Sequence, residues 1–525
     1  MNPEEIKKKQ KRVMIYVMII SLICVVGVSY AFFTAGMSSE TSTTVRADAG
    51  TMKITYDGGA NINLAGIYPK DDVWATKTIT VTGNNTTDAE MYYKLTLVVD
   101  SNTFKTDDPL QYELVSTNDS TNGEIIPNIS KTDITGTSIE LGSGHFAKAN
   151  NAKHTYLLKI YYPKKATSQN ANQGAAFSAH VEITSAKAPK TNGKLSELVL
   201  YNNEVKTPIT APGKEVSTAS EALLASTPDD YGTSYYFRGA VKNNYVEFAN
   251  KCWRIVRVGG DGSVKLILHN DNTAGVANPC DSANNSASAA FARYSETTYT
   301  SAFNTNYNDN AYVGFKYGTV GASDYATTHA NTNNSTILTN LEAWYNNNLK
   351  TYESVIDDNV WCNDKTNVTD ETYDPWNYTP NGLGYANNVT FYGATQRLVS
   401  STSGSAGGTG LSLKCNGKLS KITSKIGLIT ADELAFAGYA AGTTAGTGNT
   451  TTYLQENATD TYWWSLSPGN FYGNSARVWI VGGSSGVFGH RSVGNTSAVR
   501  PSISLKSTTN VTGNGTSSSP FVVKI

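Results

Sequence analysis

Charge is scarce in this sequence: only 16% of its 525 residues are charged, and the formal net charge is -1. No basic cluster follows Arg12, which excludes the electrostatic footprint of a nucleic-acid-binding protein. Histidine and cysteine are also few, at 6 and 5 residues, and neither H-E-x-x-H nor C-x-x-C occurs. No nucleophile elbow, paired-carboxylate motif or phosphate loop stands out. We therefore expect no metal, no cofactor and no enzymatic activity.

The sequence is instead rich in apolar and aromatic residues within a polar, uncharged background. Hydrophobic residues make up 39%, and with 31 Tyr and 8 Trp the chain can build true cores, which excludes wholesale disorder. The polar remainder is mostly Asn, Thr, Ser and Gly, which suits strands and long loops better than helical bundles. At about 150 residues per domain, the length predicts two to four domains. We expect a mainly β protein.

The N-terminus predicts export. A basic segment, 1–12, precedes an apolar run over 13–33. About 20 apolar residues span a bilayer as a helix, and the basic flank keeps the N-terminus inside, so everything after Thr34 is predicted to lie outside. Ser29-Tyr30-Ala31 also offers the small residues of a cleavage site. The segment is therefore either a transmembrane anchor or a cleaved signal.

Cysteine usage agrees with export. Cys24 lies in the apolar segment, which leaves four cysteines outside: Cys252, Cys280, Cys362 and Cys415. An even number in an oxidising compartment suggests two disulfides, for which three pairings are possible. We favour Cys252–Cys280 and Cys362–Cys415 because they close the shortest loops without crossing. Free, buried cysteines are the alternative.

Residues 46–188 are predicted to form an antiparallel, Ig-like β-sandwich, because runs with β-branched or aromatic residues at period two alternate with turn residues. The clearest runs are 51–56, 77–81, 92–99, 156–162 and 177–183. This part resembles the TasA/camelysin family, exported β-sandwich proteins of Gram-positive bacteria that include matrix-fibre components. The residues that carry the resemblance are 30–34, 47–54, 62–64 and 78–82. The resemblance implies release by a dedicated signal peptidase, with Phe32 as the first mature residue.

Residues 189–232 lack sustained periodicity and contain four prolines, so we predict a linker with one short helix around 220–224. A second domain, 233–525, follows. Near its start, strands over 252–258 and 263–268 flank a Gly-Gly-Asp-Gly turn and predict a hairpin.

Two helices are predicted in the second domain. Apolar residues recur at three- and four-residue spacing over 337–357, which indicates one buried helix face. Thr430 and Glu433 form a capping box that opens a short helix over 431–438. Two helices, a terminal hairpin and long loops describe an α+β domain of the C-type-lectin-like kind.

The stretch 462–505 is the most informative. Trp463 and Trp464, together with Trp253, are expected to be core anchors, and Arg500 a buried structural arginine. The layout resembles C-type-lectin-like domains related to the formylglycine-generating-enzyme fold. It also resembles an uncharacterised Gram-positive surface domain, through 252–257, 427–433 and the Arg500-Pro501 ending.

Some relatives on this fold are variable proteins of diversity-generating retroelements. Their mutagenesis of Asn codons cannot produce Lys, Glu, Gln, Met or Trp. Ser465 to Val499 contains no Lys, Glu, Gln or Met, although Trp479 would have to be a framework residue. Chance depletion in a Gly- and Ser-rich loop is the alternative, and only the DNA decides between them.

The predicted hairpin supplies the candidate ligand contacts, because small hydroxyls, aromatic rings and an arginine in a Gly- and Ser-rich loop are typical of adaptable binding surfaces. The candidates are Asn470, Phe471, Tyr472, Asn474, Ser484, Ser485, Val487, Phe488, His490, Arg491 and Val493. Phe488, His490 and Arg491 are expected to project outward. An ordinary solvated hairpin is the alternative. No Glu-Pro-Asn, Gln-Pro-Asp or Trp-Asn-Asp triplet is present, which argues against a calcium-dependent sugar site.

Two function classes follow. The first is a recognition or adhesion protein, membrane-anchored or secreted to the surface of a Gram-positive-type bacterium. It would bind a protein or glycan ligand on another cell, a phage or a host surface. The second is a structural biofilm-matrix protein that polymerises through 46–188, with the second domain as a decoration.

Overall fold

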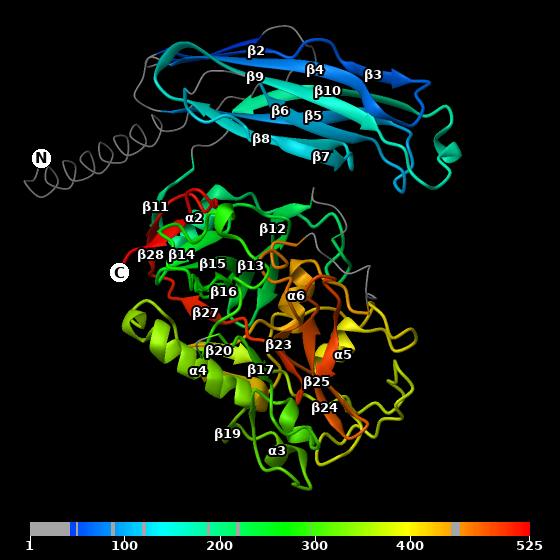
Figure 1. Ribbon diagram of the computed structural model, residues 1–525, viewed down its shortest axis with the longest axis vertical. Helices are drawn as coiled ribbons and strands as arrows, with labels where there is room; N and C mark the ends of the chain where they lie inside the picture. Colours follow the sequence, from blue (N-terminus) through cyan, green and yellow to red (C-terminus); the bar gives the residue numbers. More distant parts are fainter. Residues whose placement is uncertain are drawn as a thin grey trace, which may run out of the picture. The chain divides into compact units, whose positions relative to one another are not determined.

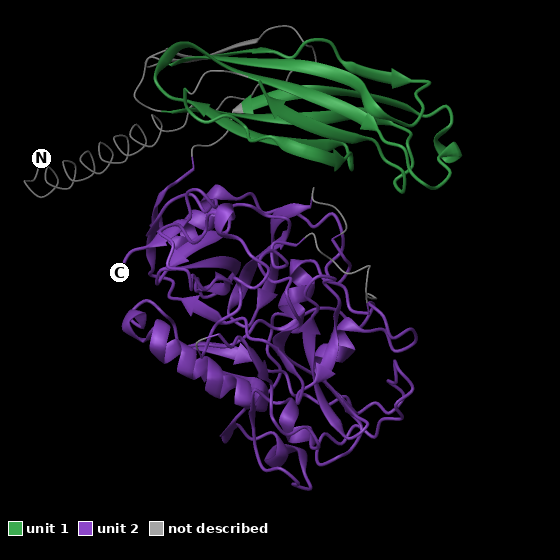
Figure 2. Cartoon of the chain, in the orientation of Figure 1, with its two compact units in different colours: residues 1–188 green, residues 189–525 purple. Residues whose placement is uncertain are grey.

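The computed structural model divides the chain into two compact units, residues 1–188 and 189–525 (Figure 2). The residues that the structure describes are 43–48, 51–85, 90–117, 122–185, 189–216, 221–295, 297–442 and 452–525. The predicted export segment, 13–33, and Cys24 lie outside these ranges. Among the described helices, none combines the length and the hydropathy needed to cross a membrane.

Unit 1 consists of two antiparallel sheets. The first has the strand order β1 (Thr43–Asp48), β2 (Thr51–Asp57), β4 (Lys70–Asn85), β9 (Ala149–Tyr162), β6 (Gln111–Ser116) and β7 (Ile129–Asp133). The second has the order β3 (Ile62–Ala65), β10 (Ala176–Ser185), β5 (Met91–Asn102) and β8 (Ser138–Phe146). A 3-10 turn, η1 (Asn170–Asn172), precedes β10. All five strands that the period-two runs predicted are present.

The buried hydrophobic side chains of the two sheets of unit 1, whose strands are drawn in Figure 1, form one core. Along β5 every second residue from Met91 to Val99 is buried, and β9 buries Tyr156, Leu158 and Ile160 in the same alternating way. A strand that is buried on one face shows this period because successive side chains point to opposite faces of a sheet. The described part of unit 1 is therefore mainly β, as predicted.

Unit 2 contains a large sheet that draws on both ends of the unit. Its strand order is β11 (Asn192–Lys194), β28 (Asn510–Thr512), β29 (Phe521–Val523), β14 (Tyr245–Phe248), β15 (Lys251–Val258), β13 (Gly232–Gly239) and β12 (Ala222–Asp229). The strand β16 (Val264–Asn270) also pairs with β15, and β27 (Ser502–Leu505) pairs with β16. The predicted β15–β16 hairpin is confirmed, and its turn places Gly262 at a positive φ.

The prediction of a linker over 189–232 is wrong. β11, the helix α2 (Leu195–Asn202) and β12 all belong to unit 2. The expected helix around 220–224 is replaced by the start of β12, whose Leu223 and Leu224 are buried. Pro228 is accommodated because β12 is the outer strand of the sheet, where a missing N–H costs no ladder bond.

A second sheet of unit 2 carries the predicted C-terminal hairpin. Its order is β17 (Thr300–Ala302), β26 (Thr496–Ala498), β23 (Trp463–Tyr472), β24 (Ser475–Val481) and β25 (Phe488–Ser492), and β21 (Thr390–Phe391) also pairs with β23. Two small ribbons complete the strands: β18 (Lys316–Tyr317) with β19 (Asn333–Asn334), and β20 (Asn359–Cys362) with β22 (Lys421–Ser424).

Short helices connect and cover these sheets. They are α3 (Tyr325–Thr328), α4 (Thr336–Asn348), α5 (Gly393–Leu398) and α6 (Ala431–Ala437), with 3-10 turns η2 (Ser282–Asn284), η3 (Asn310–Val313), η4 (Lys350–Tyr352) and η5 (Lys418–Ser420). The helix predicted over 337–357 is shorter than expected, because three consecutive asparagines, poor helix formers, end α4 before η4. The capping box is confirmed: Thr430 accepts from the Glu433 N–H, and the Glu433 side chain accepts from the Thr430 N–H.

Both favoured disulfides are present in unit 2. Cys252–Cys280 has a Cα–Cα distance of 5.0 Å, and Cys362–Cys415 one of 5.4 Å. The three predicted anchors Trp253, Trp463 and Trp464 are fully buried in the unit's core. Arg500 is buried too, and its guanidinium donates to the carbonyls of Leu268 and Leu454.

Candidate functional site

The predicted ligand contacts differ widely in exposure. Buried residues are Asn470, Phe471, Phe488 and Val493; partly exposed ones are Tyr472, Ser485, Val487, His490 and Arg491; exposed ones are Asn474 and Ser484. They do not form one patch, because Asn474 and Ser484 lie at opposite ends of β24. Seven residues at about 3.3 Å each separate those ends by roughly 20 Å.

The expectation that Phe488 projects outward is wrong. Its ring is fully buried, with centroids 4.8 Å from Trp479 and 6.0 Å from Tyr439. Phe488 is the first residue of β25, paired with Val481, so it lies in the sheet rather than in the Gly-Ser turn. Arg491 lies partly exposed over the ring of Tyr462, at 4.9 Å. Of Phe488, His490 and Arg491, only His490 is both partly exposed and on the same face of the sheet as Asn470.

Three polar side chains meet on one face of β23, β24 and β25. Asn470 pairs with Arg477 across β23 and β24, and Trp479 pairs with His490 across β24 and β25. Since alternate residues of a strand share a face, these side chains lie on the same side, and Arg491 lies on the opposite side. The Asn470 amide Nδ2 is 3.3 Å from His490 Nε2.

Aromatic side chains from a distant loop pack on this face. The ring centroid of Trp376 is 4.7 Å from that of His490, and the Tyr378 ring stacks on Tyr472 at 3.6 Å with an interplanar angle of 4°. Trp376 and Tyr378 are both partly exposed. We name the set Trp376, Tyr378, Asn470, Tyr472, Arg477 and His490 the Trp376–His490 face.

The loop that supplies these rings is held in place by local bonds. Asp374 accepts from the N–H groups of Tyr378 and Thr379, and the Trp376 indole donates to Gly404 O at 3.2 Å. Tyr378 also stacks on Phe391, whose strand β21 pairs with β23. The sequence analysis missed Trp376, Tyr378 and Arg477. No local signal links the 376–378 loop to a hairpin about one hundred residues later.

Several polar atoms of the Trp376–His490 face are buried without a hydrogen-bond partner. Within the described chain, Asn470 Oδ1, Arg477 Nε and His490 Nδ1 have none. Because His490 Nε2 faces the donor Nδ2 of Asn470, the imidazole hydrogen belongs on Nδ1, so two donors and one acceptor are unmet. Burial and the Arg477 cation lower the pKa of His490 to about 4, which leaves the ring neutral near pH 7. Leaving such groups unpaired costs about 1–3 kcal/mol each.

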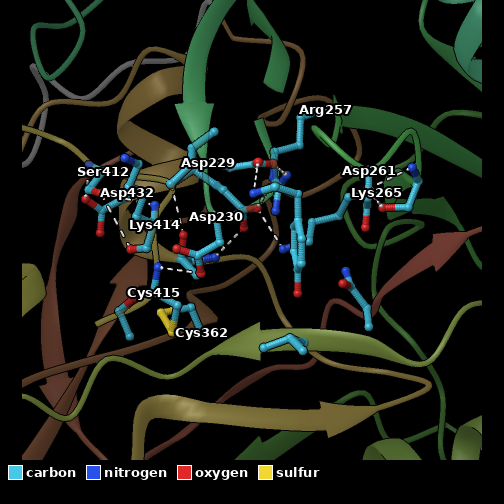
Figure 3. Close-up of a pocket in the computed structure, with 18 of the residues that line it drawn as sticks. Asp229, Asp230, Arg257, Asp261, Lys265, Cys362, Ser412, Lys414, Cys415 and Asp432 are labelled. Atoms are coloured by element: carbon cyan, nitrogen blue, oxygen red, sulfur yellow. Dashed lines mark hydrogen bonds and ion pairs between the residues drawn. A yellow bond between two sulfur atoms is a disulfide. The ribbon is translucent and has the colours of Figure 1, made fainter. Parts of the chain in front are cut away.

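A charged pocket lies elsewhere in unit 2 and encloses about 650 Å³ of space open to solvent (Figure 3). Its walls come from the end of β12, the β15–β16 turn, β20 and the start of α6. Figure 3 shows Asp230 near Lys414 and the Cys362–Cys415 disulfide, and the Cys415 N–H donates to Asp230 at 3.1 Å. Charged lining residues are Asp229, Asp230, Arg257, Asp261, Lys265, Arg397, Lys414, Asp432 and Glu433.

The buried charges of this pocket satisfy one another. Glu433 Oε1 accepts from Arg257 at 2.9 Å and from Lys265 at 2.7 Å, and Arg257 also reaches Asp229 at 3.1 Å. Burial lowers the pKa of Lys265 to about 8, against the attraction of Glu433. Burial alone would raise the pKa of Glu433, but the two cations lower it to about 2.

A second ion-pair group extends this network. Arg397 binds Asp432 through two nitrogens, each at 2.8 Å, and Asp364 through a third at 2.5 Å. Arg257, Asp432 and Glu433 come from the two segments that carry the resemblance to a surface domain. Their contacts hold β15, α5 and α6 together, so we interpret the pocket as part of the framework.

No protein-family model and no curated protein sequence matches this chain. The resemblances to the TasA/camelysin family and to C-type-lectin-like domains therefore stay predictions. The functional assignment rests on the residues of unit 2 and their geometry.

Proposed function

We propose that the protein is exported and acts as a recognition or adhesion protein that binds its ligand through the Trp376–His490 face of a C-type-lectin-like unit 2. The observation that carries the proposal is the set of unpaired polar atoms on Asn470, Arg477 and His490. Trp376 and Tyr378, which pack on His490 and Tyr472 of the same face, are partly exposed. Native proteins pair nearly all buried polar groups, and the exceptions need a physical explanation. A ligand that completes these hydrogen bonds supplies one.

The composition of the face supports binding. Binding surfaces concentrate their affinity in a few Trp, Tyr and Arg side chains around desolvated polar groups. Trp376, Tyr378 and Arg477 are of these types. The first two come from a loop that packs on the sheet, and Arg477 comes from β24. The charged pocket has a weaker claim, because its buried charges already have partners.

Export is the part of the proposal that the two disulfides support, because disulfides persist in oxidising compartments. Protease added to intact cells should digest everything after Thr34. Protection of unit 2 in intact cells, with digestion after lysis, would contradict export. Sequencing the mature N-terminus then distinguishes a cleaved signal, with Phe32 first, from an uncleaved anchor.

The binding face is tested by displaying the full chain on bacteria and measuring adhesion to a panel of bacterial and animal cells. The Trp376→Ala variant should lose adhesion at least tenfold, because an indole at the centre of such a face contributes about 2 kcal/mol or more. Tyr462→Ala is the matched control: it removes an exposed aromatic ring that packs on Arg491, on the other side of the sheet. Equal adhesion by both variants, at equal surface display, would overturn the proposed face.

The alternative function, a matrix protein that polymerises through unit 1, has one structural argument in its favour. The outer strands β1, β7 and β3 have free edges within the described chain, whereas Glu124 bridges the outer edge of β8 at His145. A free edge accepts a strand from another molecule. This alternative would be favoured if the wild type shows no adhesion and if variants of unit 2 form fibres as readily as the wild type.

Retroelement diversification of 465–499 also remains a proposal. The burial of Asn470, Phe471, Phe488 and Val493 restricts the positions that tolerate variation. Sequencing the neighbouring DNA for a template repeat and a reverse transcriptase tests this proposal. If neither is present, the proposal of retroelement diversification is wrong.

A further inference from the structure

Arg477 differs from the other arginines of unit 2. Every one of the others donates a hydrogen bond to a carboxylate, a carbonyl or a hydroxyl; they are Arg238, Arg254, Arg257, Arg293, Arg397, Arg491 and Arg500. Arg477 has no ion pair and no side-chain hydrogen bond to any residue that the structure describes, and its Nε is buried. A buried side-chain nitrogen normally has a hydrogen-bond partner. Arg477 is therefore a cation without a counter-ion.

The charge of Arg477 lies within the Trp376–His490 face. Arg477 pairs with Asn470 and lies two residues before Trp479, which pairs with His490, so its side chain lies on the same face of the sheet as theirs. Its strand partner Asn470 contributes a buried acceptor, Oδ1, and His490 contributes a buried donor, Nδ1. Arg477 itself is partly exposed, so it is reached from solvent. One cation, one neutral donor and one neutral acceptor thus lie on the same face of the sheet.

We propose that Arg477 anchors the carboxylate of an acidic saccharide, with Asn470 and His490 binding its hydroxyl groups and Trp376 packing on the apolar face of its ring. This inference rests on the proposed function and names its ligand class. A guanidinium binds carboxylates well because its planar fork matches their two oxygens.

A saccharide fits better than an isolated carboxylate or an apolar ligand. Asn470 Oδ1 is an acceptor and requires a donor, which a carboxylate lacks and a hydroxyl provides. The uncharged His490 supplies an N–H without adding a second cation. A uronic acid ring carries a carboxylate, several hydroxyls and an apolar face in one unit. It therefore matches the four side chains named in the proposal without a metal ion.

The test uses cells that display the full chain and fluorescent oligogalacturonate as the probe, in the presence of a chelator. We expect saturable binding that weakens with added NaCl, because a charge-assisted contact is screened by salt. Arg477→Gln should weaken binding at least tenfold, and Arg477→Lys less. Arg491→Gln is the matched control, since it removes the charge of the nearest arginine on the opposite side of the sheet, and it should change binding less than twofold.

Two comparison probes separate this inference from the proposed function. Neutral dextran oligomers should not bind, and poly-glutamate should bind much more weakly than oligogalacturonate. Absence of oligogalacturonate binding, or equal losses for Arg477→Gln and Arg491→Gln, would overturn the inference. Stronger binding of poly-glutamate would overturn the saccharide and identify an acidic peptide instead. In each case the proposed function stands if Trp376→Ala still abolishes cell adhesion, and fails if it does not.

Discussion

The charged pocket and the Trp376–His490 face present opposite solutions to burying polar groups in the same unit. In the pocket, Arg257, Lys265 and Glu433 are enclosed and bonded to one another. On the face, Asn470 is buried and Arg477 and His490 are partly exposed, yet each has one buried polar atom without a partner in the described chain. By charge density and concavity alone, the pocket would be the stronger candidate for a ligand site. The face is distinguished by bringing three of the unpartnered buried polar atoms of unit 2 onto one side of one sheet.

This difference has an energetic meaning. A buried ion pair mainly offsets the cost of its own desolvation, so a complete network contributes to holding the fold together without leaving capacity for a ligand. An incomplete set is a cost to the folded protein that a ligand removes on binding. The two regions should therefore respond in opposite directions when their charges are removed.

The largest effect is expected in the pocket. Glu433→Gln should lower the free energy of unfolding of unit 2 by about 4 kcal/mol, because Lys265 and Arg257 lose their shared carboxylate while buried. Thermal unfolding monitored by near-UV circular dichroism measures the loss. Lys414→Ala is the control, since Lys414 lines the same pocket but is exposed, and it should stay within about 0.5 kcal/mol. A wild-type melting temperature for Glu433→Gln would show that the network is not structural.

A somewhat smaller loss is expected for Phe488→Ala, about 3 kcal/mol, because the variant leaves a cavity between Trp479 and Tyr439. This loss of stability would show that Phe488 is a core side chain of the hairpin and not one of its ligand-binding side chains. His490→Ala, two residues along the same strand, should be less destabilising because His490 is partly exposed. If Phe488→Ala melts like the wild type, its ring is not a core contact.

The pH dependence of stability concerns two buried lysines, Lys265 of the pocket and Lys365. Burial lowers the pKa of Lys265 to about 8 and that of Lys365, which binds only neutral oxygens, to about 7. Between these values and pH 10 the unfolded chain binds more protons than the folded one, so stability should rise with pH over this window. The slope is at most about 1.4 kcal/mol per pH unit for each lysine.

Chemical denaturation at pH 7, 8, 9 and 10 measures this slope. Lys365→Met should reduce the rise in stability at the lower end of this pH range. His490→Ala should leave the slope unchanged, because His490 is already neutral throughout the range. A stability that falls steadily from pH 7 to pH 9 would contradict the assignment of the two lysines.

Local patterns in the sequence predicted the elements whose contacts are local. The period-two runs gave the strands of unit 1, and the capping box at Thr430 gave the start of α6. Loop length also favoured the two disulfides that are present. In each instance the determining residues lie close together in the chain or alternate in one strand.

The misses have a common physical cause, which is pairing between distant segments. The predicted linker missed β11 because its strand partner, β28, lies more than 300 residues away in the sequence, and a strand of three residues shows no hydrophobic period. Trp376 and Tyr378 were missed because their partners His490 and Tyr472 lie on another part of the chain. Tyr472, Asn470 and His490 were predicted from composition, but their partners were not.

The smallest predicted effect has the opposite sign to the first. Arg477→Met should raise the free energy of unfolding by about 1 kcal/mol, because it removes an unpaired cation and its buried Nε while keeping an apolar side chain of similar length. Functional sites commonly trade stability for binding in this way. Denaturant unfolding with an unchanged slope measures the gain, and oligogalacturonate binding by the same variant should be lost. Arg491→Met, which gives up a weak bond to Ser497 and its contact with Tyr462, should not be stabilising. A destabilised Arg477→Met would mean that Arg477 serves the fold, and the contrast between the face and the pocket would then disappear.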